Sequence, residues 1–257
     1  MPGRERSFRV EAVVLRHSDW GEADRMLWMF TRELGKVKAV AKGVRKVRSR
    51  KAGHLEPLTC SNLLLARGRD ILLVTQAETV EAFSPLREDL KLWELANHII
   101  ELLDRFTYEE GENHPLYRLL VDTLGRLARE PQPELVVHYY EMRLLDLVGY
   151  RPQLFHCASC GKEIQAEDQF FSAEHGGVLC PSCGRAVKGA RPITLAALKY
   201  LRHFQRSSYA EASRARIPLN VMREIEGLME HYLTYLLERG LNTMAFIRQT
   251  RRLENKE

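Results

Sequence analysis

Long apolar runs are missing from this chain of 257 residues. The apolar stretches at residues 26–30 and 71–74 fall well short of the roughly 18 residues that a membrane-spanning helix needs. The first 20 residues contain Glu11 and Arg16 within their apolar part and lack a small-residue cleavage site, which argues against a secretory signal. We therefore expect a cytoplasmic protein with no membrane partner.

Common catalytic motifs are missing as well. The sequence contains no G-x-x-x-x-G-K-[ST], no G-x-S-x-G and no H-E-x-x-H motif. No pair of acids lies beside a histidine and a turn in the way that a metal-dependent nuclease requires. We also find no internal repeat and no low-complexity tract. The chain is expected to be a binding protein and not an enzyme.

The composition is that of a folded protein with unevenly placed charge. Hydrophobic residues make up 45% and charged residues 28%, which excludes disorder as the main state. The net charge of +5 is the sum of +7 in residues 1–80 (16 basic, 9 acidic), −7 in residues 81–150 (7 basic, 14 acidic) and +5 in residues 151–257 (16 basic, 11 acidic). This pattern favours separate modules with separate partners, although surface charge is also uneven in proteins where it has no function.

The first 80 residues are typical of a small β-barrel. Five short runs rich in branched and aromatic residues, separated by glycine-containing turns, lie at residues 8–15, 25–30, 36–41, 63–66 and 71–75. This number of strands fits a five-stranded barrel of the OB type, and an SH3-like barrel fits nearly as well. Residues 36–40 alternate polar and apolar, so Lys36 and Lys38 are expected on a basic, solvent-facing side of the third strand.

The remaining sequence predicts helices. Apolar residues recur every three or four positions through residues 85–148, in three bundle helices of which the last follows Pro133 and ends at Gly149. Further helices are predicted from residue 195 and from Ile217 and Pro218, the latter ending at Gly240. We expect these helices to share one core. The predicted fold class is α+β, with an OB-type barrel at residues 1–80 and an all-α domain at residues 81–257 that carries a cysteine-rich insert at residues 154–188.

Four cysteines in this insert form the most specific motif of the chain. The spacing C-x2-C-x19-C-x2-C predicts one structural zinc-ribbon site with four thiolate ligands and no open coordination position, made by Cys157, Cys160, Cys180 and Cys183. Disulfides are the main alternative, disfavoured by the odd fifth cysteine, Cys60, which we expect to be a buried small hydrophobe. A rubredoxin-like iron site, or ligation by His156 or His175, also stays open. A zinc deaminase is excluded, because Pro181 follows Cys180 where that chemistry needs a proline before the cysteine.

Ten residues of the first region hold six cations and no acid. Residues 42–51 are too polar for a buried strand, so they are expected to form an exposed loop between two barrel strands. Like charges at this density favour a polyanion such as nucleic acid, although a merely solvated loop is the alternative. Trp20 is the preferred stacking candidate because residues 17–22 resemble a loop, whereas Trp28 and Phe30 are expected in the core. The candidate DNA-binding residues are Lys36, Lys38, Lys42, Arg45, Lys46, Arg48, Arg50, Lys51 and Trp20.

A second basic stretch, residues 185–223, has nine basic residues and one acid. Steps of three and four residues place part of it on one helical face. This face is a candidate second nucleic-acid surface or simply a solvated helix. Its candidate residues are Arg191, Lys199, Arg202 and Arg206.

Three segments of the barrel carry a family resemblance. Gly21-Glu-Ala-Asp-Arg-Met, Thr31-Arg-Glu-Leu-Gly35-Lys and Val40-Ala-Lys-Gly-Val-Arg45, running into Ser49-Arg50, resemble the bacterial recombination mediators of the RecO family, as does the order of barrel, helical domain and four-cysteine insert.

The resemblance implies binding of single- and double-stranded DNA, ATP-independent strand annealing and a place at the nucleoid. It also implies partnership with RecR and with the acidic C-terminal tail of single-stranded DNA-binding protein, and assistance to RecA loading in gap repair. By matching position, the DNA contacts would be Lys42, Arg45, Lys46, Arg48 and Arg50. Candidates for the tail pocket are Arg129, Arg143, Lys199 and Arg202.

Two other classes of protein fit the same features. A transcription or RNA-binding factor would use the ribbon for a protein partner and the barrel for RNA. A nuclease that needs added Mg²⁺ is the third possibility.

Overall fold

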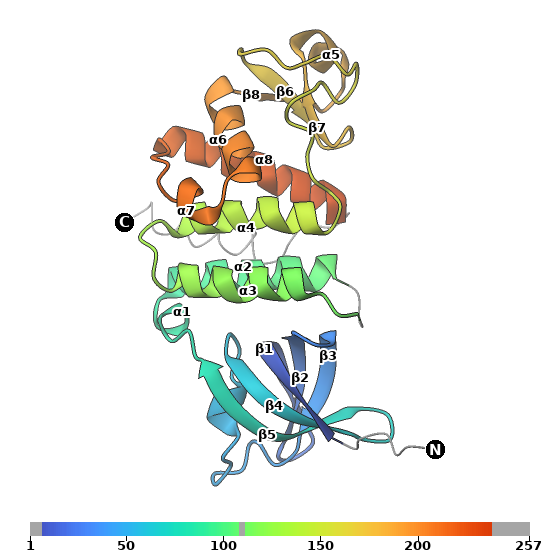
Figure 1. Ribbon diagram of the computed structural model, residues 1–257, viewed down its shortest axis with the longest axis vertical. Helices are drawn as coiled ribbons and strands as arrows, with labels where there is room; N and C mark the ends of the chain where they lie inside the picture. Colours follow the sequence, from blue (N-terminus) through green and yellow to red (C-terminus); the bar gives the residue numbers. More distant parts are fainter. Residues whose placement is uncertain (1–6, 108–110, 238–257) are drawn as a thin grey trace. The chain divides into compact units, whose positions relative to one another are not determined.

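The computed structural model describes residues 7–107 and 111–237 (Figure 1). The chain divides into two compact units, Met1–Glu130 and Pro131–Glu257. No helix in the described ranges is long and apolar enough to cross a membrane.

The first unit contains a closed five-stranded barrel. Its strands are β1 (Ser7–Trp20), β2 (Asp24–Thr31), β3 (Gly35–Ala41), β4 (Cys60–Arg67) and β5 (Leu72–Glu81), and they close in the order β1-β2-β3-β5-β4. The pairing of β3 with β5 is parallel, and the other pairings are antiparallel. This closed barrel confirms the predicted OB-type fold.

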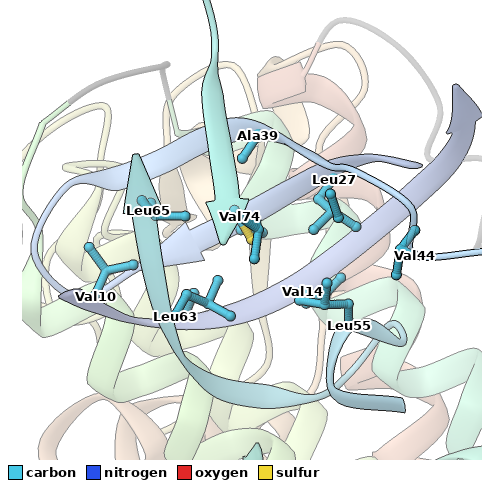
Figure 2. Close-up of a cluster of buried hydrophobic side chains, with 12 residues drawn as sticks. Val10, Val14, Leu27, Ala39, Val44, Leu55, Leu63, Leu65 and Val74 are labelled. Atoms are coloured by element: carbon cyan, nitrogen blue, oxygen red, sulfur yellow. The ribbon is translucent and has the colours of Figure 1, made fainter. Parts of the chain in front are cut away.

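Alternate side chains of the strands fill the barrel. Val10 and Val14 of β1, Leu27 of β2 and Leu63 and Leu65 of β4 point toward one another in the interior (Figure 2). This is the period of two that a strand with one buried face requires. The barrel core is therefore supplied by the same alternation that predicts the strands from the sequence.

The first strand is longer than its sequence suggests. A register shift between Val14 and Arg16 lets β1 continue antiparallel to β2 as far as Trp20, which pairs with Asp24. The prediction of a loop at residues 17–22 is therefore wrong for residues 17–20. A β-bulge of this kind re-aims the side chains that follow it, so polar residues after position 15 still belong to a strand.

The connection from β3 to β4 contains the basic loop, residues 42–51, followed by the short 3-10 helix η1 (Ala52–Leu55). Val44, within the loop, and Leu55, just after it, are both buried in the barrel core (Figure 2). The apolar side chains of Val44 and Leu55 thus attach the loop to the barrel, while most of its cations face outward.

Three helices follow the barrel in the first unit: α1 (Pro85–Glu88), α2 (Leu90–Phe106) and α3 (His114–Leu127). The side chain of Asp89 caps α2 by accepting from the N–H of Leu92, and Asn113 caps α3 in the same way. Because these helices belong to the same compact unit as the barrel, the boundary predicted at residues 80 and 81 lies inside this unit and stays a prediction.

Contacts between barrel and helices are polar as well as apolar. The hydroxyl of Tyr117 on α3 donates to Glu11 on β1 at 3.0 Å and lies 3.4 Å from the sulfur of Cys60. Burial raises the pKa of Cys60 to about 11. Cys60 is 1% exposed, which confirms the prediction of a buried small side chain.

The second unit contains α4 (Pro133–Leu147), α6 (Leu195–Arg206), α7 (Tyr209–Ala212) and α8 (Leu219–Leu237). Helix α4 packs against α6 and α8, and it ends at Leu147, two residues before Gly149, whose φ of +85° suits glycine. A single core for all helices was expected, but α2 and α3 belong to the first unit. The predicted end at Gly240 lies outside the described residues.

A small sheet and a short helix form a knob in the second unit, residues 153–193. Its strands β6 (Gln169–Ser172), β7 (Gly177–Leu179) and β8 (Arg191–Ile193) pair in the order β7-β6-β8, with α5 (Pro181–Ala186) beside them. Within this unit, α6 and α8 lie between α4 and the knob (Figure 1). The predicted helical domain with a cysteine insert is confirmed.

A buried ion pair in the second unit predicts a pH dependence. His138 is 5% exposed, and its Nδ1 lies 2.8 Å from Oε2 of Glu141. Burial opposes the charged imidazolium, but the charges of Glu141, Glu226 and Glu134 outweigh it and raise the pKa of His138 above 6.5. The resulting stabilisation is complete below about pH 6.5 and is lost as the pH rises through the raised pKa.

We expect Glu141→Gln to lower the free energy of unfolding by about 3 kcal/mol at pH 6, and by less as the pH rises. Urea denaturation at several pH values measures both. The matched control is Glu174→Gln, an exposed acid of the same unit. A difference between E141Q and the unchanged protein that did not vary with pH would contradict the prediction.

Candidate nucleic-acid interface and metal centre

The four cysteines of the knob converge on one point. The sulfur atoms of Cys157, Cys160, Cys180 and Cys183 all lie within 4.8 Å of one another, and those of Cys160 and Cys180 are 3.9 Å apart. Four thiolates around one ion at a Zn–S distance of about 2.3 Å lie about 3.8 Å from each other. The arrangement therefore fits a tetrahedral metal ion with four sulfur ligands.

Local backbone geometry produces this convergence. After each C-x2-C pair the chain folds back, with the N–H of Gly161 bonded to the carbonyl of Cys157 and the N–H of Gly184 to that of Cys180, both at 2.8 Å. A side chain at Gly184 would collide with Phe170 at 2.3 Å, which explains the glycine there. Each pair thus presents its two sulfurs on one side.

The surroundings of Cys157 favour its thiolate form. Burial opposes ionisation of Cys157, but N–H groups of Cys160, Cys180 and Ser159 direct their dipoles at it and lower its pKa to about 6. Neither His156 nor His175 is part of the cluster found among the described residues, so the histidine alternatives are not supported. None of the five cysteines forms a disulfide. With four sulfurs a metal ion would have no open position, so its chemistry would be structural.

The basic loop presents most of its cations to solvent. Lys42, Lys46, Arg48 and Arg50 are exposed, and no carboxylate within the described part of the chain pairs with them. Val47, between two of them, is fully exposed at the tip. Unneutralised cations of this density attract a polyanion.

Arg45 has a different role from its neighbours. Its guanidinium pairs with Asp19 at 3.1 Å and donates to the carbonyls of Gly21 and Glu22 at 3.4 and 3.3 Å. These contacts tie the basic loop to the turn between β1 and β2. They also place the loop beside the end of β1, where Trp20 is 54% exposed.

Lys36 and Lys51, the first and last cations among the candidate DNA-binding residues, are held by contacts within the protein. The ammonium of Lys36 pairs with the carboxylate of Asp104 at 2.8 Å and donates to the carbonyls of Asp104 and Thr107, so its side chain is only 12% exposed. Lys51 donates to the carbonyl of Val74 at 2.9 Å, and burial lowers its pKa. Neither ammonium faces solvent as the sequence pattern suggests.

An outward-facing row on the barrel holds Lys38, which is exposed as predicted, and two residues that were not predicted there. Arg16, Trp28 and Lys38 are neighbours across β1, β2 and β3, and the guanidinium of Arg16 lies 3.7 Å from the centre of a Trp28 ring. Trp28 is half-buried on this outer face, so its assignment to the core is wrong, whereas Phe30 is buried as predicted. The alternation Leu27–Trp28–Met29 indicates that Trp28 faces outward, because Leu27 and Met29 face the interior.

The predicted second basic face is divided in the structure. Arg202 and Arg206 both lie over the ring of Phe155, whereas Lys199 lines a separate hollow on α6. Arg191 is on β8 and donates to the carbonyl of Gly227 at 3.5 Å. Of the four residues, the structure therefore brings together only Arg202 and Arg206 at one contact.

Comparison with known proteins agrees with this architecture. Residues 6–83 match the family model described as Recombination protein O N terminal, and residues 87–245 match Recombination protein O C terminal. The chain belongs to the RecO family. DNA repair protein RecO of Roseiflexus sp. (strain RS-1) is 40% identical over 250 residues, which cover 97% of this chain and 88% of that protein. DNA repair protein RecO of Dehalococcoides mccartyi (strain CBDB1) is 36% identical over 240 residues, 93% and 94% of the two chains.

Membership of the RecO family connects both sites to DNA repair. The N-terminal model covers the barrel with the basic loop, and the C-terminal model covers the cysteine cluster. The resemblance noted from the barrel segments is thereby confirmed.

Loss of the metal ligands is expected to unfold the knob selectively in this RecO chain. Replacing one cysteine of each pair, in Cys157→Ser/Cys180→Ser, removes half of the ligand set, and a ribbon of this kind depends on its metal for folding. We expect elemental analysis to show the loss of one bound metal ion, and limited proteolysis to cut within residues 153–193 while the barrel stays intact. Cys60→Ala, which touches no ligand, is the control and should keep its metal. A full equivalent of metal in the double variant would contradict the site.

Proposed function

We propose that this protein is a DNA-binding recombination mediator of gap repair that anneals complementary single strands without ATP. The observation that carries the proposal is the set of four unpaired cations of the basic loop beside the exposed Trp20, on an OB-type barrel of a RecO-family chain. The loop would bind the phosphates of single- and double-stranded DNA, and Trp20 would stack on an unpaired base.

The mechanism needs no bond-making step, so the protein is not an enzyme in this proposal. Lys42, Lys46, Arg48 and Arg50 would neutralise phosphates and release their counterions. Two strands held with their charge reduced repel each other less, and base pairing then supplies the free energy of annealing. Arg45 would contribute by holding the loop and not by binding phosphate, since its guanidinium is occupied by Asp19.

The outer row of the barrel would extend this surface. Arg16, stacked on Trp28, and Lys38 in the next strand add positive charge and an aromatic ring to the outer face of β1–β3. Stacking on arginine and tryptophan tolerates any base, as a protein that anneals unrelated sequences requires. Lys36 and Lys51 are left out of the proposed surface because their ammonium groups are held by the protein.

Zn²⁺ is the proposed ion of the cysteine cluster. A set of four thiolates in two C-x2-C pairs is the donor set that structural zinc prefers, and iron is the less common occupant. The ion would hold the knob together, and Cys157, Cys160, Cys180 and Cys183 would be its ligands.

Membership of the RecO family and one hollow in the second unit support the proposed protein partners. We propose RecR, the RecA loading pathway and the acidic C-terminal tail of single-stranded DNA-binding protein as partners, acting at the nucleoid in the cytoplasm. A hollow of about 690 Å³ on α6 is lined by Leu195, Ala196, Lys199, Tyr200, His203 and Ala215. Its apolar walls and single lysine suit a peptide that combines carboxylates with apolar side chains.

Only one of the four predicted tail-binding cations lines this hollow. Lys199 does, whereas Arg143 donates to the carbonyls of Ser207 and Gln205, and Arg202 lies over Phe155. Arg129 is an exposed residue of the first unit. The proposal therefore keeps Lys199 alone from that set.

Charge reversal in the basic loop is the main test. Neutralising four phosphates of a single strand predicts that log K falls with log salt with a slope of roughly −3. In Lys42→Glu/Lys46→Glu/Arg48→Glu/Arg50→Glu we expect a much shallower slope and loss of annealing, measured with labelled complementary oligonucleotides in EDTA without nucleotide. Metal content should not change.

A control pair of substitutions with the same change in net charge separates a local effect from a general one. Arg48→Glu/Arg50→Glu should weaken DNA binding strongly, whereas Arg69→Glu/Arg118→Glu changes the net charge equally at exposed positions and should not. Annealing retained by the fourfold variant would move the site elsewhere. A preference for ribose strands would favour an RNA-binding factor, and Mg²⁺-dependent cleavage would favour a nuclease.

The tail pocket has its own test. Lys199→Glu should weaken binding of a fluorescent peptide with the acidic C-terminal sequence of single-stranded DNA-binding protein by about tenfold, because a carboxylate would face a carboxylate. Lys188→Glu, an exposed lysine of the knob, is the control. Equal affinities of both variants would exclude this hollow.

A further inference from the structure

Phe155, at the base of the knob, lies under two guanidinium groups of α6. The Cζ atom of Arg206 is 3.7 Å and that of Arg202 is 5.0 Å from the centre of the ring. Arg206 is exposed and Arg202 is half-buried. A cation held this close to a ring face is attracted by its quadrupole.

The ring and the arginines are fixed in place by hydrogen bonds. Arg202 donates from Nε to the carbonyl of Leu154, and Gln205 donates to the carbonyl of Pro152, both at 2.8 Å. On the other side, the N–H of Ile164 in the knob donates to the carbonyl of Phe155 at 3.0 Å. The segment before the first cysteine pair is therefore held by both α6 and the knob, so an arginine stacked on it loses little freedom on binding a ligand.

The charge of this contact is not neutralised by the protein. No acid in residues 7–107 or 111–237 forms an ion pair with Arg202 or Arg206. Burial and the nearby charge of Arg206 lower the pKa of Arg202, and Glu163 opposes this only in part. Two adjacent cations with no acid in ion-pair contact favour an anionic ligand.

A hollow of about 400 Å³ opens beside these residues, and we call it the Phe155 hollow. It is lined by Arg151, Pro152, Gln153, Phe155, His156, Gln205 and Arg206. Arg151 is half-exposed and forms an ion pair with Asp146 at 3.5 Å, and a partly exposed ion pair of this length is weak. The lining thus combines the exposed guanidinium of Arg206 and the weakly paired guanidinium of Arg151 with the apolar surfaces of Pro152 and Phe155.

The lining of the Phe155 hollow fits a sugar–phosphate. A guanidinium stacked flat on a ring leaves its N–H edge free, and that edge matches a phosphate by two parallel hydrogen bonds. The apolar wall beside it suits a deoxyribose. A string of carboxylates would use the same charge but would gain nothing from the apolar wall.

We propose that the Phe155 hollow is a second phosphate-binding site, which takes the sugar–phosphate backbone of a second nucleic-acid strand. Arg206 and Arg151 bind its phosphates, Phe155 holds Arg206 flat, and Arg202 is the positioning residue that fixes the segment. The inference rests on the proposed function, because it adds a second strand to the one bound by the basic loop. It replaces the predicted face of Arg191, Lys199, Arg202 and Arg206 with a set that spans α6 and the knob.

Counting strands on the full chain tests the proposal. Native mass spectrometry with an eight-nucleotide oligothymidylate, which cannot self-anneal, reports the number of strands per chain. We expect two strands on the unchanged protein, one on Arg151→Gln/Arg206→Gln and two on the control Arg69→Gln/Arg118→Gln. In anisotropy titrations, the affinity for the first strand should change less than twofold in R151Q/R206Q, and the affinity for the second should fall by at least about tenfold.

A conservative variant separates geometry from charge. Arg206→Lys keeps the charge but loses the flat fork, so second-strand affinity should still fall several-fold. Phe155→Leu should give a similar loss with unchanged metal content. Full second-strand affinity in both variants would overturn the role assigned to the stack.

The outcomes distinguish this inference from the proposed function. No strand on the unchanged protein would overturn both. One strand that depends on the basic loop, or two strands that R151Q/R206Q does not reduce, would overturn only the second site. Arginine-dependent binding of inorganic phosphate as tight as that of the oligonucleotide would identify a site for free phosphate instead, and tighter binding of an oligoglutamate would identify an acidic peptide.

Discussion

The ion pair between Arg45 and Asp19 determines how the barrel can present its cations. Six positive side chains in ten residues repel one another, and a loop with no internal anchor would spread them over many conformations. Here one of the six is used to hold the rest. Arg45 binds Asp19 and two carbonyls of the β1–β2 turn, its own N–H bonds to Ala23, and the N–H of Gly43 bonds to Asp24 at 2.7 Å. The loop is therefore fixed beside Trp20, and the four solvent-exposed cations, Lys42, Lys46, Arg48 and Arg50, are held on that fixed loop.

The sequence predicts those parts of the molecule that depend on local patterns. Alternation of apolar residues defines the barrel strands, and the spacing of two C-x2-C pairs defines the metal centre. The sequence does not show which cations have no partner within the protein. Lys36, Lys51 and Arg45 differ from Lys46 or Arg48 only in their partners, and these lie far away in the chain, at Asp104, Val74 and Asp19. The register shift after Val14 is equally silent in the sequence, and it places Arg16 opposite Trp28.

The division of the helices is a second feature that local patterns do not contain. Residues 85–148 have one continuous helical periodicity, yet α2 and α3 belong to the unit of the barrel and α4 to the other. Anchors such as the Lys36–Asp104 pair and the Tyr117–Glu11 hydrogen bond attach the earlier helices to the barrel. The packing of α4 on α6 and α8 cannot be read from its own periodicity, because the helix is buried on nearly all sides and its buried residues include His138 and Glu141.

The knob is an integral part of the second unit and not a finger on a flexible stalk. Glu224 of α8 accepts from the N–H and hydroxyl of Thr194 at 2.6 and 2.7 Å, and Asp168 of the knob accepts from the N–H of Leu195 at 2.9 Å, so the start of α6 is held from both sides. Tyr232 of α8 packs edge-on against Phe171 of the knob and donates to the carbonyl of Tyr150. Order at the metal centre is thus coupled to the helix that lines both hollows.

The burial of Cys60 has a practical consequence for this molecule. Its thiol is covered by Tyr117 and its pKa is raised to about 11, so it reacts slowly with electrophiles near neutral pH. The other four cysteines of the chain all belong to the metal cluster. A thiol-reactive dye would therefore report only on the state of that cluster, and its labelling stoichiometry would give the fraction of molecules that have lost the ion, with no cysteine needing to be removed beforehand.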